Sequence, residues 1–239
     1  MAEPIELIRL ADELNLGPRE HIALVGGGGK TTILHALGSQ LDGRVILTTT
    51  TKMGSDQDHG FRIVAAREVD SDLAEVGTSI VWRRVEGNKA HGVSREDCDR
   101  WAELVDYVVI EADGARQRPF KAPASYEPVI PETVTQMISV IGADALGRVI
   151  ADQCHRPMRV AALADCEPYQ RLTPSGAAAV LLHQRGARRS MPGRARFTVA
   201  ITKVDHTNRA LVDELVHELS ATEPDLPIIP IHNHPNSLR

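Results

Sequence analysis

The chain alternates short apolar runs with longer segments in which apolar residues recur every three or four positions. Continuous apolar runs are typical of strands buried on both faces, and the longer period is typical of amphipathic helices. The expected strands cover residues 21–25, 44–48, 61–65, 79–84, 107–111, 137–141, 196–202 and 226–231. The expected helices cover about residues 4–15, 30–41, 94–105, 173–183 and 208–220. This alternation predicts an α/β fold of three layers, with a mostly parallel sheet and helices on both faces.

A glycine-rich turn follows the first expected strand directly and opens the next helix. Its consecutive residues are Gly26, Gly27, Gly28, Gly29, Lys30, Thr31 and Thr32. Glycines let backbone amides point inward toward an anion, and the helix N-terminus adds its positive dipole end. Lys30 would then reach the β- and γ-phosphates of a nucleotide, and the Thr31 hydroxyl would ligate Mg²⁺. The turn therefore predicts a phosphate cradle in a P-loop NTPase-like fold.

The turn departs from the usual phosphate-loop pattern at Leu24. That pattern places a glycine five residues before the last glycine of the loop, whereas Leu24 lies inside the expected strand. Either the loop is shortened, with four successive glycines absorbing the strain, or its entry is built differently. A turn that binds nothing is the less favoured interpretation, because four glycines cost backbone entropy.

Four threonines, Thr48–Thr51, end the second expected strand. If this strand ends beside the cradle, their hydroxyls and amides could meet Mg²⁺ or a γ-phosphate, as switch segments do. Thr50 and Thr51 are the better candidates, and Thr50 is the predicted metal ligand. The preference of threonine for strands explains the run equally well.

Two carboxylates, Glu111 and Asp113, stand at the end of the apolar run 107–111. A magnesium nucleotide needs an acidic residue on a strand near the cradle, because it holds the waters that complete the coordination of the cation. At a spacing of two, both side chains would point the same way if the strand continued. We therefore expect one to hold the metal and the other to orient water, and both, with Lys30, are the candidate catalytic residues.

A long irregular region follows, an insertion covering about residues 113–135. Residues 115–131 carry Arg116, Arg118 and Lys121 among several prolines. Long loops at the functional edge are often lids or binding loops. Their cations could neutralise phosphate charge or hold an anionic substrate, and a solvated basic loop is an equally good interpretation.

The strand that ends at Thr202, Lys203 and Asp205 resembles the guanine-reading signature of GTPases, Asn/Thr-Lys-x-Asp. In that signature the aspartate accepts hydrogen bonds from guanine, and the lysine stem covers the ring. Adenine lacks this pair of donors, so GTP is favoured over ATP. The alternative is that Asp205 only caps the following helix.

Composition narrows the class of protein further. The 239 residues show no linker, repeat or low-complexity tract, so a single domain over 1–239 is expected. A net charge of −5 and 3% aromatic residues weigh against nucleic-acid binding. The acidic N-terminus and short apolar runs are unlike a signal peptide or a membrane span, so we expect a cytoplasmic protein with reduced thiols at Cys98, Cys154 and Cys166.

Taken together, several motifs resemble the YqeC family, accessory proteins of selenium-dependent molybdenum hydroxylases. The motifs are Gly26–Thr32, Thr48–Met53, Glu111–Ala115, Lys121–Pro123 and Glu127–Pro131. The resemblance covers most of the chain. It implies a P-loop nucleotide-binding protein that helps to mature such a hydroxylase, acting on its apoenzyme, its cofactor or its maturation proteins.

The residues and the resemblance together predict a Mg²⁺-dependent nucleoside triphosphatase, with GTP favoured and ATP as the alternative. Two other functions remain open. One is a kinase or ligase whose 115–131 loop binds a small acceptor. The other is a binding module that uses the nucleotide only as a conformational label.

Overall fold

The computed structural model describes residues 3–69 and 77–232, and its centre is an eight-stranded sheet. Every adjacent pair of strands in this sheet runs parallel. In spatial order the strands are β13 (Ile228–His232), β12 (Arg196–Val204), β10 (Gln136–Gly142), β1 (Glu20–Gly26), β8 (Tyr107–Glu111), β2 (Arg44–Thr49), β5 (Gly77–Trp82) and β4 (Arg62–Ala65). The predicted parallel sheet is confirmed.

Alternate residues of β1 enter two separate hydrophobic cores, one on each face of the sheet. Ile22 and Leu24 pack with the helices α1 (Leu10–Glu13) and α2 (Lys30–Gln40). Ala23 and Val25 belong to the other core, which includes buried residues of α4 (Arg95–Leu104), α7 (Pro174–Leu182) and α8 (Arg209–Thr222). A strand with apolar residues on both sides needs cover on both faces, which explains the continuous apolar runs and the three layers.

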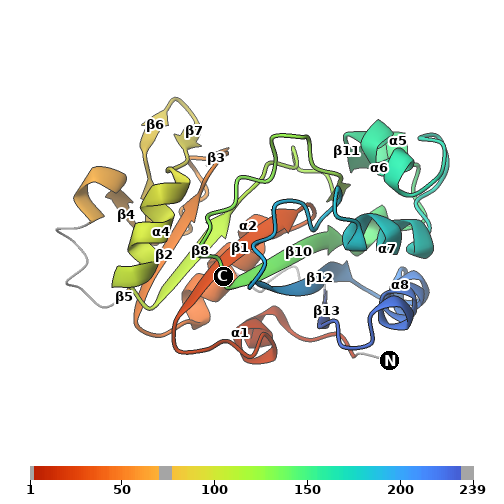
Figure 1. Cartoon of the computed structure of the whole chain (residues 1–239), viewed down its shortest axis with the longest axis horizontal. Helices are drawn as coiled ribbons and strands as arrows, with labels where there is room; N and C mark the ends of the chain where they lie inside the picture. The colour runs from red at the N-terminus through yellow and green to blue at the C-terminus, as the bar shows by residue number, and fades with distance from the viewer. Residues whose placement is uncertain (1–2, 70–76, 233–239) are drawn as a thin grey trace.

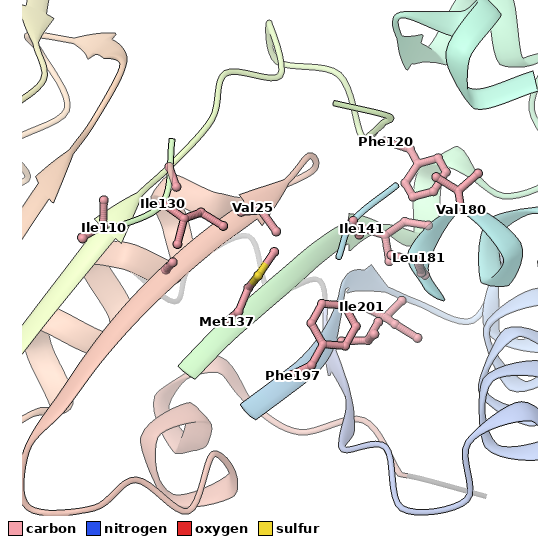
Figure 2. Close-up of a cluster of buried hydrophobic side chains, with 14 of the residues drawn as sticks. Val25, Ile110, Phe120, Ile130, Met137, Ile141, Val180, Leu181, Phe197 and Ile201 are labelled. Carbon is pink, nitrogen blue, oxygen red and sulfur yellow. The ribbon is translucent and has the colours of Figure 1, made fainter. Parts of the chain in front are cut away.

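The second of these cores anchors the irregular region that follows β8. Phe120 is 1% exposed and lies in the same core as Ile141 of β10 and Val180 and Leu181 of α7. Figure 2 shows these side chains together near the ends of the strands. The 115–131 segment is therefore held by apolar packing against the sheet.

Two small sheets were not foreseen. The pair β9 (Phe120–Lys121) and β11 (Cys154–His155) is parallel, and a three-stranded antiparallel sheet contains β3 (Lys52–Gly54), β7 (Lys89–His91) and β6 (Arg84–Glu86). The expected strand over 79–84 therefore divides, because β5 ends at Trp82 and Arg84 begins the hairpin. Strands of two or three residues are too short for periodicity to reveal.

The short elements lie at the upper edge of the view, where the sheet strands end (Figure 1). The three-stranded sheet stands at one side, and α5 (Ile150–Gln153) and α6 (Pro157–Leu163) stand at the other. The segment after β8 runs between them.

Near the N-terminus the expected helix over 4–15 is reduced to a 3₁₀ turn, Leu7–Arg9, followed by the four-residue α1. Leu7, Leu10 and Leu14 are buried, but Ile8, which the expected helix would have placed on the same face as Leu14, is 76% exposed. Within the described residues, the structure contains no helix with the length and apolar character needed to cross a membrane.

Candidate functional site

The glycine turn is a shortened loop. The strand β1 runs through Gly26 and α2 begins at Lys30, so Leu24 stays within the strand. Gly26 and Gly28 have φ values of 94° and 82°, in the left-handed region that favours glycine. A Cβ atom at either position would also clash with the backbone of β10. Successive glycines therefore take up the strain, and this settles the alternative left open by the sequence.

Lys30 lies at the start of α2 and is only 4% exposed. Its Nζ donates to the carbonyl oxygen of Gly26 at 2.6 Å and lies 3.2 Å from Asp113 Oδ1 and 3.7 Å from Glu111 Oε1. Burial by itself would lower the pKa of Lys30, but the charges of Asp113 and Glu111 outweigh it and hold the pKa above its usual value. Lys30 is therefore a buried cation at the mouth of the turn.

The two predicted carboxylates meet the turn from the neighbouring strand β8. The Thr31 hydroxyl donates to Glu111 Oε2 at 2.8 Å, and the amide of Gly26 donates to Asp113 Oδ2 at 3.2 Å. The strand ends at Glu111, so Asp113 reaches the turn from the loop beyond it. The structure thus brings Lys30, Thr31 and both carboxylates together.

Asp113 begins a line of alternating charges, here called the charge chain, that comprises Asp113, Lys121, Glu127 and Arg156. Lys121 Nζ lies 3.0 Å from Asp113 Oδ2 and 2.9 Å from Glu127 Oε2. The Arg156 guanidinium lies 2.9 Å from the same Glu127 oxygen. Burial alone would raise the pKa of Glu127, but the Lys121 hydrogen bond and the charges of Lys121 and Arg156 hold it below its usual value. The chain connects the turn to α6.

Lys121 is 2% exposed, so it is not part of a solvated basic loop. Glu127 and Arg156 are additions to the site predicted from the sequence. In the sequence, Glu127 belongs to one of the motifs that carry the family resemblance. A buried lysine demands a carboxylate partner, but the sequence does not reveal that Lys121 is buried.

A cavity of about 510 Å³, here called the cradle cavity, opens in front of the glycine turn. Its cationic lining residues are Lys30, Lys52, Lys89, Arg116, Arg118 and Lys203. The carboxylates that line it are Asp56 and Glu111. Six cations against two carboxylates leave an excess of positive charge, which suits a polyphosphate anion.

Thr50 and Thr51 do not line the cradle cavity. The Thr50 hydroxyl donates to the carbonyl oxygen of Val129 at 2.7 Å, and the amide of Thr51 donates to Thr49 Oγ1 at 3.1 Å. The threonine run therefore ties the end of β2 to the irregular segment in this structure. Its predicted role at the metal stays a prediction.

The end of β12 contacts the cradle through Thr202, whose hydroxyl donates to the carbonyl oxygen of Gly28. Lys203 lines the cradle cavity and its Nζ lies 2.7 Å from Asp144 Oδ2. Asp205 does not line it. Of the residues predicted to recognise guanine, Lys203 therefore lies beside the cradle, and Asp205 lies farther along the turn.

The Asp205 carboxylate caps the turn before α8. Its Oδ1 accepts from the Thr207 hydroxyl at 2.6 Å, the Thr207 amide at 2.8 Å and the Asn208 amide at 3.2 Å. These hydrogen bonds, with those from Thr207 largest, lower the pKa of Asp205. The capping role that competed with base recognition is therefore present, and it is compatible with a second role for the carboxylate.

The donor set beside the turn suits Mg²⁺. Thr31, Glu111 and Asp113 offer hard oxygen atoms only, the kind of ligand that Mg²⁺ prefers. The described ranges hold no group of three or more His, Cys, Asp or Glu residues able to bind a metal by themselves. A cation held partly by substrate phosphates and water needs no such group.

The three cysteines are free thiols, as expected. Burial raises the pKa of both Cys98 and Cys154, to about 12 for Cys154. Cys166 is partly exposed, although burial raises its pKa too. We expect an aromatic disulfide reagent at pH 8 to modify Cys166 alone in the native protein and all three thiols in denaturant. Fast native labelling that survives a Cys166→Ser substitution would contradict this assignment.

Comparison with known proteins places the chain in a family. Residues 22–158 match the family described as YqeC protein, a range that includes the cradle and the charge chain. The chain is also 31% identical to "Uncharacterized protein YqeC" of Escherichia coli K12 over 211 residues, covering 83% of this chain and 82% of that protein. The chain therefore belongs to the YqeC family.

Proposed function

We propose that this protein binds a nucleoside triphosphate with Mg²⁺ at the glycine turn and hydrolyses it. The observation that carries the proposal is the meeting of Lys30, Thr31, Glu111 and Asp113 at the glycine turn. A buried lysine and a hydroxyl at a helix N-terminus, faced by carboxylates from a neighbouring strand, supply what phosphoryl transfer needs. The positive lining of the cradle cavity adds attraction for phosphates.

Lys30 is engaged by carboxylates in this structure, so nucleotide binding would exchange one set of anions for another. The triphosphate would take the lysine from Asp113, which keeps Lys121 as a partner. Thr31 with Glu111 or Asp113 would hold Mg²⁺, which neutralises charge on the phosphates when bound. The second carboxylate would orient the attacking water.

Catalysis on this site would consist of positioning and charge stabilisation. Arg116 lines the cradle cavity and is exposed, with φ of 50° in a strained backbone conformation. Arg118 also lines the cavity, but its guanidinium donates to the carbonyl oxygen of Asp152, so Arg116 is the better candidate to neutralise phosphate charge. Slow turnover by the protein alone is expected if a partner must order this segment.

GTP is the proposed nucleotide, because Lys203 lies beside the cradle and Asp205 follows it at the spacing of the guanine signature. The test is a parallel calorimetric titration with non-hydrolysable GTP and ATP analogues and Mg²⁺. We expect tighter binding of the GTP analogue, and a loss of that preference in Asp205→Asn.

The Thr207→Val variant is the matched control, since it removes a hydrogen bond to Asp205 but keeps the carboxylate. It should preserve the preference for GTP. Equal affinity for both analogues in the natural protein, unchanged by Asp205→Asn, would disprove guanine recognition. Nucleotide binding itself would stand.

We further propose that this activity serves the maturation of a selenium-dependent molybdenum hydroxylase, a role that the family resemblance suggests. The partner would be the hydroxylase apoenzyme or a protein that matures its cofactor, in the cytoplasm. None of the three thiols lies in an activating environment, which favours a role for the nucleotide site over covalent selenium handling.

A further inference from the structure

A second cavity of about 550 Å³ lies beside the cradle cavity. Lys52 and Gly114 line both cavities, so the two adjoin at these residues. Polar residues that line the second cavity include Thr50, Thr51, Lys52, Arg83, Arg84 and His91. The second cavity has no role in the nucleotide binding proposed above.

The three-stranded sheet builds one wall of the second cavity. His91 on the central strand β7 lies directly opposite Lys52 on β3 and Arg84 on β6. Directly opposite residues of antiparallel strands place their side chains on the same face. The sheet therefore presents a row of three basic side chains to the cavity, and Arg83 directly precedes Arg84 in the chain.

Of the four basic residues Lys52, Arg83, Arg84 and His91, two have no carboxylate partner in the part of the chain that the structure describes. Arg84 and His91 share Glu86, whose Oε2 lies 3.3 Å from the arginine and 3.2 Å from the histidine. Within residues 3–69 and 77–232, by contrast, neither Lys52 nor Arg83 forms an ion pair. Two uncompensated cations on one cavity wall attract an anion.

The opposite wall does not cancel this charge. Glu127 is the carboxylate that lines the cavity, and Lys121 and Arg156 each lie 2.9 Å from its Oε2. The charge of Glu127 is therefore already neutralised by the charge chain. The field inside the cavity is therefore set by Lys52 and Arg83, because Glu86 offsets the charge of Arg84.

We propose that the second cavity binds a small molecule bearing a carboxylate or phosphate group, as a second ligand beside the nucleotide. The proposal rests on nucleotide binding in the cradle cavity, and it adds an anionic small molecule to the ligands of the protein. The volume lies in the range of small-molecule sites, about 300–1,000 Å³. The shared wall at Gly114 would bring this anion next to the phosphate end of the nucleotide.

A binding experiment with inorganic phosphate as the probe tests this inference. The full-length protein is first saturated with Mg²⁺ and a non-hydrolysable triphosphate analogue, which fills the cradle cavity. Phosphate is then titrated and followed by ³¹P NMR line broadening. We expect binding to the natural protein and about a tenfold or greater loss of affinity in the Arg83→Gln/Arg84→Gln double variant, since charge-assisted hydrogen bonds to an anion are lost.

Arg194→Gln is the matched control. Arg194 is exposed and precedes β12, at the edge of the sheet opposite the two cavities, so its loss should leave phosphate binding unchanged. Phosphate binding of equal strength in the double variant, or none in the natural protein, would overturn the proposal. A melting curve for each variant checks that the fold is intact.

The two proposals can fail separately. Should the triphosphate analogue itself not bind, the nucleotide proposal fails. Phosphate titration of the Lys30→Ala protein, whose cradle has lost its buried cation, then tests the second cavity by itself. The double substitution added to Lys30→Ala should still weaken phosphate binding about tenfold, and no weakening would overturn the second site.

Discussion

Lys30→Ala is expected to weaken binding of a Mg²⁺–triphosphate analogue by about a hundredfold or more. Lys30 is the buried cation of the cradle, with 4% of its surface exposed, so solvent screens its charge little. A charge-assisted hydrogen bond to phosphate contributes about 1.5–3 kcal/mol, and long-range attraction to the triphosphate adds to it. Isothermal titration calorimetry with each variant measures the change directly.

Lys30→Met and Arg194→Ala complete this experiment. The methionine variant retains most of the side-chain volume, so a similar loss of affinity would show that the charge is responsible. The Arg194 variant removes a cation from the opposite edge of the sheet and should bind normally. Unchanged affinity in Lys30→Ala, with a native melting curve, would exclude the cradle as the phosphate site.

Lys121→Met is expected to lower the free energy of unfolding by about 3 kcal/mol, because it breaks two buried ion pairs and leaves each carboxylate with one cation fewer. Lys121 is buried between Asp113 and Glu127 and also donates to the carbonyl oxygen of Gly114 at 2.7 Å. Lys30 and Arg156 remain as partners of the two carboxylates. The decrease in the free energy of unfolding should therefore lie at the lower end of the range that is usual when a buried ion pair is broken. Urea unfolding at pH 7 measures it.

The destabilisation by Lys121→Met should shrink in acid. The folded pKa of Glu127 lies below its unfolded value, so its ionised form adds stability above the unfolded pKa, about 4.3. That stability is lost as the pH falls through the folded pKa, and a protonated Glu127 has less need of Lys121. Urea curves at pH 7 and pH 3.5 should therefore show a smaller difference at the lower pH.

Arg9→Met is the control for the charge chain. Arg9 pairs with Glu13 at 3.4 Å, but both side chains are largely exposed, so this pair should matter far less. If Lys121→Met changed the free energy of unfolding no more than Arg9→Met, the charge chain would have no role in stability.

The residues of the glycine turn could be predicted from the sequence because the pattern that identifies them consists of neighbouring residues. Gly26–Thr32 lie between an apolar strand and a helix, and the order of these elements fixes where the turn points. Glu111 could be predicted for the same reason, since it ends a buried strand and parallel strands end at one edge of a sheet. Local pattern and strand direction together place these side chains close to one another.

The charge chain could not be predicted in this way. Asp113 and Glu127 lie in irregular segments, Lys121 ends the two-residue strand β9, and Arg156 immediately precedes α6. Their contacts depend on how the 115–131 segment folds back, and Phe120 anchors that segment by packing against α7. Packing of this kind depends on residues distant in sequence, so the spacing of apolar residues along the chain does not predict it.

The sequence by itself determined the layers of this protein, the position of the glycine turn and the two carboxylates that face it. Apolar period and strand direction are properties of consecutive residues, and they are enough for that result. Only the tertiary structure decided that Lys121 is a buried partner of Asp113, that Asp205 caps a turn and that a second basic cavity adjoins the cradle. Burial and ion pairing arise when distant segments exclude water together, and the chain order alone does not specify which segments meet.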